Sequence, residues 1–308
     1  MTVFPPICQY FITRRCNGGC AICALRKGTC QEQTFKEAKQ SMLDLEKGGV
    51  KGVKALGGEP TLVRWLPVLV SFVNNETGLR LAILSNCHFN KEMAERLVTA
   101  GLDTFFASYD IPETKDHGMR EKARKAHEVL AFFRARGLKI LGVNVVIAPH
   151  NVTSIAAIVE KMSSKGIWTN LSSIIHGKGN FVIRTEMAEG MLADKDRPHL
   201  EHLSQKLIEL KKAGALITNS DEYILGLGTT GVDLDWHCTK PTMLQLDYDG
   251  QVMTCPDREG QKSFSPCDLL HGELDEFERQ WKEDASKCSG CYWSAAFDAF
   301  FGLPAYWR

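Results

Sequence analysis

The sequence predicts an α/β fold built on a parallel β-sheet, and two observations support this class. From residue 7 to residue 175, short apolar runs with strand character alternate with longer segments that have the 3.6-residue period of amphipathic helices. Strands that alternate with helices form parallel sheets, because each helix carries the chain back to the start of the next strand. The 308 residues, 44% of them hydrophobic, can also bury a barrel-sized core and support a small appendage.

The individual elements follow in order from these patterns. The apolar, β-rich run 7–12 predicts the first strand, the periodic segment 35–47 predicts a helix, and the run that ends at Gly57 predicts the second strand. Further strands and helices complete six strand–helix units. These strands are expected at 79–86, 103–110, 138–148 and 167–175, and these helices at 62–75, 91–100, 120–136, 152–165 and 199–213.

Charge and hydropathy exclude several classes of protein. Lysine plus arginine and aspartate plus glutamate both number 37, so no net field attracts nucleic acid or anionic lipid. The sequence has no uninterrupted apolar run of about 18 residues. It also has no charged segment followed by an apolar core and a cleavage site. We therefore predict a cytoplasmic protein with no membrane partner, and the charge balance indicates no nucleic-acid partner.

Eleven cysteines in a chain without an export signal predict metal or redox chemistry in a reducing compartment. The cysteines form two groups, and none lies between residues 88 and 237. Two metal-binding regions are therefore expected. The first group is Cys8, Cys16, Cys20, Cys23, Cys30 and Cys87, and the second is Cys238, Cys255, Cys267, Cys288 and Cys291.

The motif CNGGCAIC follows the first strand and carries Cys16, Cys20 and Cys23. This CxxxCxxC spacing suits three irons of a 4Fe-4S cube and leaves the fourth iron open to a small molecule that the cluster can reduce. Half of a zinc site, or three buried thiols, is the alternative. Zinc sites use four protein ligands, and neither alternative accounts for the GGEP motif at residues 57–60, after the second strand.

With a thiol loop after the first strand and GGEP after the second, the sequence resembles the radical SAM superfamily. The resemblance implies a partial (β/α)6 TIM-type barrel whose cysteine loop binds a 4Fe-4S cluster. It also implies that S-adenosyl-L-methionine (SAM) chelates the open iron and that the GGEP motif holds its methionine amino group. The cofactor-binding residues implied by this motif are Gly57, Gly58, Glu59 and Pro60.

In such barrels the chemistry lies at the carboxyl ends of the strands. The resemblance implies that polar residues at these ends contact the ribose and carboxylate of SAM, and that an arginine in DHGMR is a further carboxylate contact. The alternative is that the strand-end residues only form turns. The implied contacts are Ser85, Asn86, Ser108, Asn144 and Arg120. Other polar residues near the barrel mouth predict a polar substrate, namely Arg14, Tyr109, Asp110 and His176.

The second cysteine group lies in the tail of the chain. The segment LQLDYDGQVMTC predicts a β-hairpin with an Asp-Gly turn, which brings Cys238 and Cys255 towards each other. A helix at 274–282 then leads to the CxxC pair Cys288 and Cys291. Four thiolates in this arrangement suit either an auxiliary 4Fe-4S cluster or a structural zinc ion.

This tail resembles the twitch domain, a short form of the SPASM extension. The resemblance implies that the four tail cysteines hold a second 4Fe-4S cluster. We accordingly expect two domains, a radical SAM core over residues 1–215 and a twitch domain over residues 216–308. The layout is similar to that of aminoglycoside epimerases and aminocyclitol dehydrogenases.

The resemblance implies that a flavodoxin or ferredoxin supplies an electron and that SAM is cleaved to a 5'-deoxyadenosyl radical. The radical would take hydrogen from a polar small-molecule substrate that is carbohydrate-like or aminoglycoside-like. Cys267 lies between the two pairs of tail cysteines and is a candidate catalytic hydrogen donor, which favours an epimerase. A structural thiol and an auxiliary-cluster ligand are the other interpretations of Cys267.

Three other functions remain as alternatives: a dehydrogenase of an aminocyclitol or alcohol, a peptide-modifying maturase, and a non-enzymatic iron–sulfur electron carrier. Only fifteen residues precede Cys16, which leaves no room for the leader-recognition domain of many maturases. A molybdenum cofactor cyclase is a further class to consider. Such cyclases normally end in Gly-Gly, whereas this chain ends in PAYWR, which argues against that class. An electron carrier has no need of an open iron or a GGEP motif.

Overall fold

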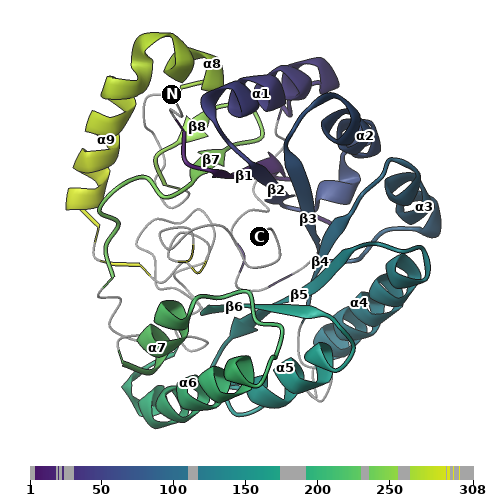
Figure 1. Cartoon of the computed structure of the whole chain (residues 1–308), viewed down its shortest axis with the longest axis vertical. Coiled ribbons are helices and arrows are strands. Elements are labelled where there is room, and N and C mark those ends of the chain that lie inside the picture. The colour runs from purple at the N-terminus through teal and green to yellow at the C-terminus, as the bar shows by residue number, and fades with distance from the viewer. Residues whose placement is uncertain are drawn as a thin grey trace.

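The fold is organised around one β-sheet, which is seen in the computed structural model of the chain (Figure 1). Eight strands lie in the order β6-β5-β4-β3-β2-β1-β7-β8. The structure describes residues 4–18, 20, 23, 31–109, 117–173, 192–229, 236–255, 264–288, 290, 291, 294 and 298, with the backbone alone for 117–120.

The first six strands pair in parallel with their neighbours, as strand–helix alternation predicts. They are β1 (Ile7–Thr13), β2 (Gly52–Gly57), β3 (Arg80–Ser85), β4 (Thr104–Ser108), β5 (Ile140–Ile147) and β6 (Trp168–Ser173). The tail adds β7 (Leu244–Leu246), parallel to β1, and β8 (Val252–Met253), antiparallel to β7. The predicted α/β class is confirmed, and six parallel strands in this order are consistent with a partial TIM-type barrel.

Helices surround the strands on the outside (Figure 1). The first of them begins at a capping box, in which Thr34 and Glu37 bond to each other's backbone N–H groups, and it ends at Gly49 with a φ of 105°. The α-helices are α1 (Phe35–Gly48), α2 (Leu66–Glu76), α3 (Lys91–Thr99), α4 (His117–Ala135), α5 (Ile155–Ser163), α6 (Arg197–Lys212), α7 (Asp221–Thr229), α8 (Pro266–Asp268) and α9 (Leu274–Ser286). Shorter helical segments are η1 (Pro60–Leu62), η3 (Asp194–Asp196) and η4 (Leu269–Glu273).

One predicted helix, 62–75, begins later than expected. The chain first forms the 3-10 turn η1, whose first N–H groups are capped by the Glu59 side chain, and α2 starts only at Leu66. A turn this short shows no periodic spacing of apolar residues, so the sequence pattern could not distinguish it from the first turn of the helix. The other predicted helices up to residue 213 begin and end within a few residues of the observed bounds.

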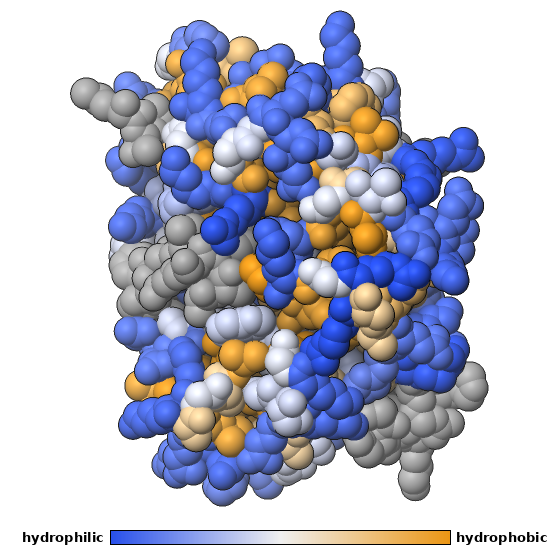
Figure 2. All heavy atoms as spheres, turned by 45° about the vertical axis from the view of Figure 1, so that its right-hand side comes forward, coloured by the Kyte–Doolittle hydropathy of each residue, from blue (hydrophilic) through white to orange (hydrophobic). Residues whose placement is uncertain are grey.

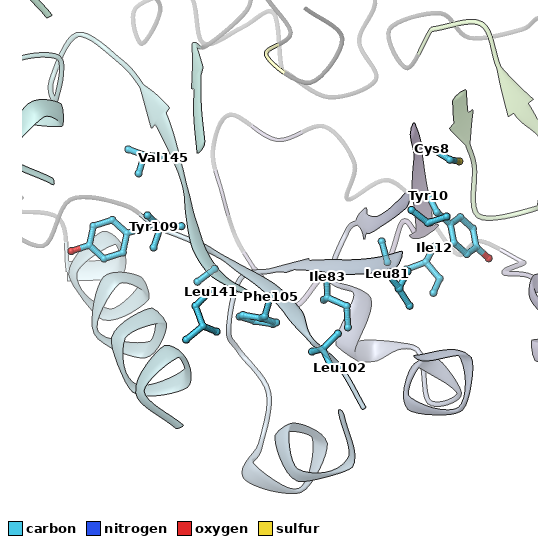
Figure 3. Close-up of a cluster of buried hydrophobic side chains, with 14 of the residues drawn as sticks. Cys8, Tyr10, Ile12, Leu81, Ile83, Leu102, Phe105, Tyr109, Leu141 and Val145 are labelled. Atoms are coloured by element: carbon cyan, nitrogen blue, oxygen red, sulfur yellow. The ribbon is translucent and has the colours of Figure 1, made fainter. Parts of the chain in front are cut away.

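Alternation along the strands produces two apolar layers, one on each face of the sheet. On the outer face, Ile83, Phe105 and Leu141 come from successive strands and point towards the helices (Figure 3). None of the three is more than 5% exposed. The inner face holds a separate cluster, whose buried members are Ile7, Ala82, Phe106 and Met243.

Gly142 on β5 leaves room for the Phe106 ring on the inner face, because a Cβ at Gly142 would overlap that ring. We expect Gly142→Ala to lower the free energy of unfolding by about 1–3 kcal/mol, the range for overpacking a core. Urea denaturation of the cluster-free protein measures the change. In the control, Gly78→Ala, the new Cβ meets only the end of the Glu46 side chain, so little stability should be lost. Equal stability of the two variants would contradict the prediction.

The tail continues the core sheet. β7 hydrogen-bonds to β1, an isolated bridge joins Thr169 to Ile217, and α7 packs against α6. The predicted boundary at residue 215 therefore does not coincide with a break in the packing. A strand of three residues is too short to be recognised as part of a parallel sheet from its sequence.

Hydrophilic side chains cover most of the face seen in Figure 2, with apolar side chains visible between them. Among the residues that the structure describes, the large hydrophobic side chains that are exposed are Val68 at 48% and Leu225 at 53%. Single exposed side chains of this kind are ordinary and need no functional explanation. Within the same described ranges, no helix combines the length and the apolar character needed to span a bilayer.

Candidate active site

The two glycines of the GGEP motif hold the end of β1 against the end of β2. Gly58 N donates a hydrogen bond to the carbonyl oxygen of Thr13 over 2.7 Å. A Cβ at Gly57 would overlap that same oxygen, and a Cβ at Gly58 would overlap the carbonyl oxygen of Arg15. Gly57 also has a φ of 129°, which favours glycine. The residue after Arg15 is the first cysteine of the thiol loop, so the glycines determine where that loop begins.

Glu59 has no exposed surface, and its carboxylate accepts four hydrogen bonds. Oε1 accepts from Thr61 N (3.1 Å), Thr61 Oγ1 (2.6 Å) and Ser85 Oγ (2.7 Å), and Oε2 accepts from Asn86 N (2.8 Å). Burial raises the pKa of Glu59, while these hydrogen bonds act in the opposite direction. The side chain therefore ties the end of β2 to the end of β3. We expected it to contact SAM, but no part of the carboxylate is exposed to a ligand.

Cys16 and Cys20 lie close together after the end of β1. Their Sγ atoms are 3.4 Å and 4.0 Å from the point that a Cβ of Gly18 would occupy. Cys16 Sγ accepts a hydrogen bond from Gly18 N (3.3 Å), and Cys20 Sγ accepts one from Lys122 Nζ (3.9 Å). Cys23 packs on apolar side chains of the inner face. Donors aimed at sulfur fit thiolates that carry an iron–sulfur cluster, whose potential depends on such hydrogen bonds.

Asn86 connects the GGEP motif to the thiol loop. Its backbone N–H donates to Glu59, and its side-chain Nδ2 donates to Cys16 Sγ (3.7 Å) and to Asn17 Oδ1 (3.0 Å). The neighbouring Ser85 is 1% exposed, and its hydroxyl is used by Glu59. Of these two predicted SAM contacts, the side chain of Asn86 reaches the loop and that of Ser85 does not.

The other predicted strand-end residues form a polar row on the inner face of β4, β5 and β6. Ser108 and Asn144 are partners in the β4–β5 register, and both are partly buried. Asn170 Nδ2 donates to Asn144 Oδ1 over 2.5 Å, and Thr218 Oγ1 donates to Asn170 Oδ1 over 2.8 Å. This row lies two strands or more away from the GGEP motif. Three predicted positions lie outside the described residues: Asp110, His176 and the side chain of Arg120.

Two residues expected at the barrel mouth have other surroundings. Tyr109 is 1% exposed and lies on the side of the sheet that the helices cover (Figure 3), where its hydroxyl hydrogen-bonds to His127 Nε2 on α4 (3.1 Å). With Ser108 on the inner face, alternation directs the next side chain outward. Arg14 forms an ion pair with Asp247 (2.6 Å) and lies over the Tyr248 ring, so it joins the end of β1 to the tail.

The four tail cysteines predicted as ligands line one cavity of about 80 Å³ beside the β7–β8 hairpin. The backbone N–H of Cys291 is held by the carbonyl oxygen of Trp236 (2.9 Å). Among the described residues, no three His, Cys, Asp or Glu side chains are arranged to hold a metal ion. Four cysteines that line one cavity suit either a 4Fe-4S cluster or a zinc ion. The lining cysteines are Cys238, Cys255, Cys288 and Cys291.

Burial raises the pKa of the Cys16 thiol and raises the pKa of Cys238 to about 11, with nearby Cys288 adding to the second shift. Both directions are expected when a charged form is moved away from water. A coordinating metal ion deprotonates a thiol outright. The raised pKa values are therefore compatible with both thiols acting as cluster ligands.

Cys267 lies on the outside of the barrel. It is part of α8, which packs against α1 in the outer helical layer (Figure 1). Its thiol is exposed and lies 3.5 Å from His271 Nδ1. It does not line the cavity of the tail cysteines. The geometry thus gives no support to Cys267 as a hydrogen donor or as an auxiliary ligand.

Sequence reasoning missed a second polar row on the inner face. Register pairs Gln9 of β1 with Gln245 of β7 on one side and with Lys54 of β2 on the other. Lys54 Nζ lies 5.5 Å from the centre of the Phe106 ring, and burial lowers the pKa of Lys54 to about 8. The signal in the sequence was a single long polar residue inside an otherwise apolar strand, as in CQYF, VKAL and LQLD.

A parallel α/β barrel with a cysteine loop locked to a glycine-rich strand end defines a class of iron–sulfur barrel proteins. The model of the radical SAM superfamily matches residues 10–175, which is more than half of the chain. The chain belongs to the radical SAM superfamily.

Curated relatives differ in how much of the chain they cover. A probable GTP 3',8-cyclase of Sulfolobus acidocaldarius is 29% identical over 282 residues, which span 87% of this chain and 86% of the relative. The Fe-coproporphyrin III synthase of Methanosarcina barkeri is 31% identical over 169 residues, which span 53% of this chain and 42% of the synthase. This chain therefore spans less than half the length of the synthase and most of the length of the cyclase.

Solved structures share the fold at low sequence identity. Streptococcus suis SuiB bound to S-adenosylmethionine superposes with a TM-score of 0.72 at 16% identity, covering 92% of this chain and 68% of SuiB. anSMEcpe with bound AdoMet and the Cp18Cys peptide superposes with a TM-score of 0.62 at 16% identity, covering 96% of each chain. At these identities the similarity establishes the fold alone.

Proposed function

We propose that this protein is a SAM-dependent radical enzyme that abstracts hydrogen from a polar small molecule held inside the barrel. The observation that carries the proposal is the close packing of the GGEP glycines against the backbone of the residues just before Cys16, which we call the lock between β1 and β2. This lock brings a loop of three thiols to the carboxyl ends of the strands, where barrels of this kind carry out their chemistry. When bound there, a 4Fe-4S cluster and SAM supply a 5'-deoxyadenosyl radical.

We assign the first cluster to the thiols of Cys16, Cys20 and Cys23. The SAM site would lie beside this loop, with the backbone of Gly57 and Gly58 and the side chain of Asn86 as contacts. Ser108 and Asn144 would meet the far end of SAM from β4 and β5, with Arg120 as a further carboxylate contact. In this proposal Glu59, Pro60 and Ser85 are positioning residues, because all three are buried.

We assign a second 4Fe-4S cluster to the tail, since four thiols line one cavity. The likeness of this tail to a twitch domain supports the same assignment. A flavodoxin or ferredoxin would supply the electron that starts the reaction. Cys238, Cys255, Cys288 and Cys291 would hold this cluster, which would supply an electron acceptor for the oxidation of an alcohol or aminocyclitol by loss of a hydrogen atom, an electron and a proton.

Epimerisation is less well supported by the geometry than oxidation. The prediction of an epimerase requires a hydrogen donor across the substrate from the radical, and Cys267 is exposed on the outer layer. If this protein is an epimerase, its hydrogen donor must be a different residue, on the inner face of the barrel.

A second candidate function is cyclisation of a nucleotide. The curated relatives that cover most of this chain carry the name GTP 3',8-cyclase. Lys54 on the inner face offers a positive charge that suits phosphate. Mass analysis of products with GTP and with alcohols separates the candidates, because an oxidised product is two hydrogens lighter than its substrate.

The test of the proposed function is SAM cleavage by the reconstituted protein. Two clusters predict about eight irons per chain, and Cys20→Ala or Cys288→Ala should each leave about four. After reduction with dithionite, the wild type should release 5'-deoxyadenosine, Cys20→Ala should release none, and Cys267→Ala should retain both iron and cleavage. Absence of 5'-deoxyadenosine from the wild type, or undiminished cleavage in Cys20→Ala, would overturn the proposal.

A further inference from the structure

Three neighbouring strands place a lysine and two glutamines side by side on the inner face of the barrel. Gln245, Gln9 and Lys54 occupy one row across β7, β1 and β2. Adjacent strands are about 4.8 Å apart, so one small ligand can touch all three side chains. The next position of this row is Ala82 on β3, a small buried side chain in the same inner-face cluster as Phe106.

Within the part of the chain that the structure describes, the side-chain oxygens of both glutamines lack hydrogen-bond partners. Gln9 and Gln245 are 5% and 4% exposed, and the Oε1 atom of each is buried without a hydrogen bond. Among the residues that the structure describes, Lys54 has the Phe106 ring as its cation–π partner and no ion pair. Buried polar groups are normally hydrogen-bonded, and leaving them unpaired costs about 1–3 kcal/mol each. Packing alone therefore does not explain the row.

The carboxylate whose charge acts on Lys54 already accepts hydrogen bonds from other residues. Asp298 acts on Lys54 through its charge, but its oxygens accept hydrogen bonds from Asn219 Nδ2 (2.9 Å) and from the backbone and hydroxyl of Ser220 (both 2.8 Å). Since no carboxylate among the described residues is bonded to Lys54, its ammonium group is available to an incoming anion.

The row also lies between the two cysteine sites. Gln245 lines the cavity of the four tail cysteines. Lys54 precedes Gly57 by three residues, which is about 10 Å along the strand from the GGEP motif. A ligand held along the row would thus have the tail cavity at one end and the thiol loop above the other.

We propose that Lys54, Gln9 and Gln245 bind the substrate, with Lys54 holding an oxyanion and the glutamine oxygens accepting hydrogen bonds from neighbouring hydroxyl or amino groups. The substrate in this proposal is a small molecule with two features. One is a phosphate or carboxylate group, and the other is a neighbouring hydroxyl or amino group that donates hydrogen bonds. This inference rests on the proposed function, since it takes the barrel interior as the substrate chamber.

Calorimetric titration of the anaerobically prepared holoprotein tests the inference with defined probes. Pyrophosphate and succinate distinguish a phosphate site from a carboxylate site, and glucose serves as the uncharged probe. We expect the wild type to bind one of the two anions, and Lys54→Met to weaken that binding at least tenfold. Lys51→Met is the matched control, because Lys51 is exposed and lies just before the same strand. The Lys51→Met protein should bind the anion with the same affinity as the wild type.

The inference is overturned if the wild type binds neither anion, or if Lys54→Met binds it as well as the wild type does. A thermal melt shows whether Lys54→Met is folded, and Gln245→Leu gives a second variant that should also weaken binding. SAM cleavage by the wild type is measured separately. If the wild type cleaves SAM but Lys54→Met binds the anion as well as the wild type does, only the proposed anion site is contradicted. If the wild type binds the anion through Lys54 but cleaves no SAM, the proposed function fails alone.

Discussion

Replacing Gly58 with alanine is expected to abolish binding of the first cluster and all SAM cleavage, while the tail cluster remains. The new Cβ would overlap the carbonyl oxygen of Arg15, a backbone atom that cannot rotate away. The end of β1 would have to move, and Gly58 N would lose its 2.7 Å hydrogen bond to Thr13. Because Cys16 follows directly, a shift of this segment displaces the thiol loop from the GGEP motif.

Iron analysis and electron paramagnetic resonance of the reduced protein measure this effect. Gly58→Ala should hold about four irons, those of the tail cluster, and should release no 5'-deoxyadenosine. Gly78→Ala should behave like the wild type, because its Cβ meets only a flexible side-chain end. A Gly58→Ala protein with full iron content and normal cleavage would show that the lock between β1 and β2 is dispensable.

Glu59→Leu is expected to destabilise the cluster-free protein strongly. The carboxylate accepts from the backbone N–H groups of Thr61 and Asn86, and leucine would leave both without partners. At about 1–3 kcal/mol for each buried unsatisfied group, the expected loss in free energy of unfolding is about 2–6 kcal/mol. Glu59→Gln keeps one oxygen, and the nearby hydroxyls can rotate to accept from its amide. The loss in Glu59→Gln should therefore be smaller.

Urea denaturation of the two variants, both prepared without iron, separates these expectations. SAM binding by folded Glu59→Gln then shows whether the carboxylate has a further part in the site. If Glu59→Leu were as stable as the wild type, the four hydrogen bonds would not be what holds the ends of β2 and β3 together.

The order of strands and helices in the core could be predicted from the sequence, because apolar periodicity records which faces are buried. The thiol loop and GGEP were recognisable because cluster and SAM binding restrict residue type and spacing. The structural reason for the two glycines could not be predicted from the sequence. Gly57 and Gly58 are small because another backbone passes within contact distance, and a sequence does not say which segment that is.

The misplaced residues have equally local causes. Tyr109 was expected at the barrel mouth, although counting alternate positions from Phe106 would have directed it outward. Cys267 was placed by its position between two pairs of cysteines, but that spacing does not show that Cys267 lies on α8 in the outer layer. Lys54 passed unnoticed because one charged residue in an apolar strand resembles an ordinary exposed position until the barrel closes around it.

The pairing of β7 with β1 limits how the tail can move. A tail tethered by a flexible linker could swing open to admit substrate or to exchange electrons. Here such a swing would break the β1–β7 hydrogen bonds and the ion pair between Arg14 and Asp247. The β7–β8 hairpin, which leads to Cys255, is therefore held against the strand that leads into the thiol loop. A substrate that enters the barrel would have to do so without separating this hairpin from β1.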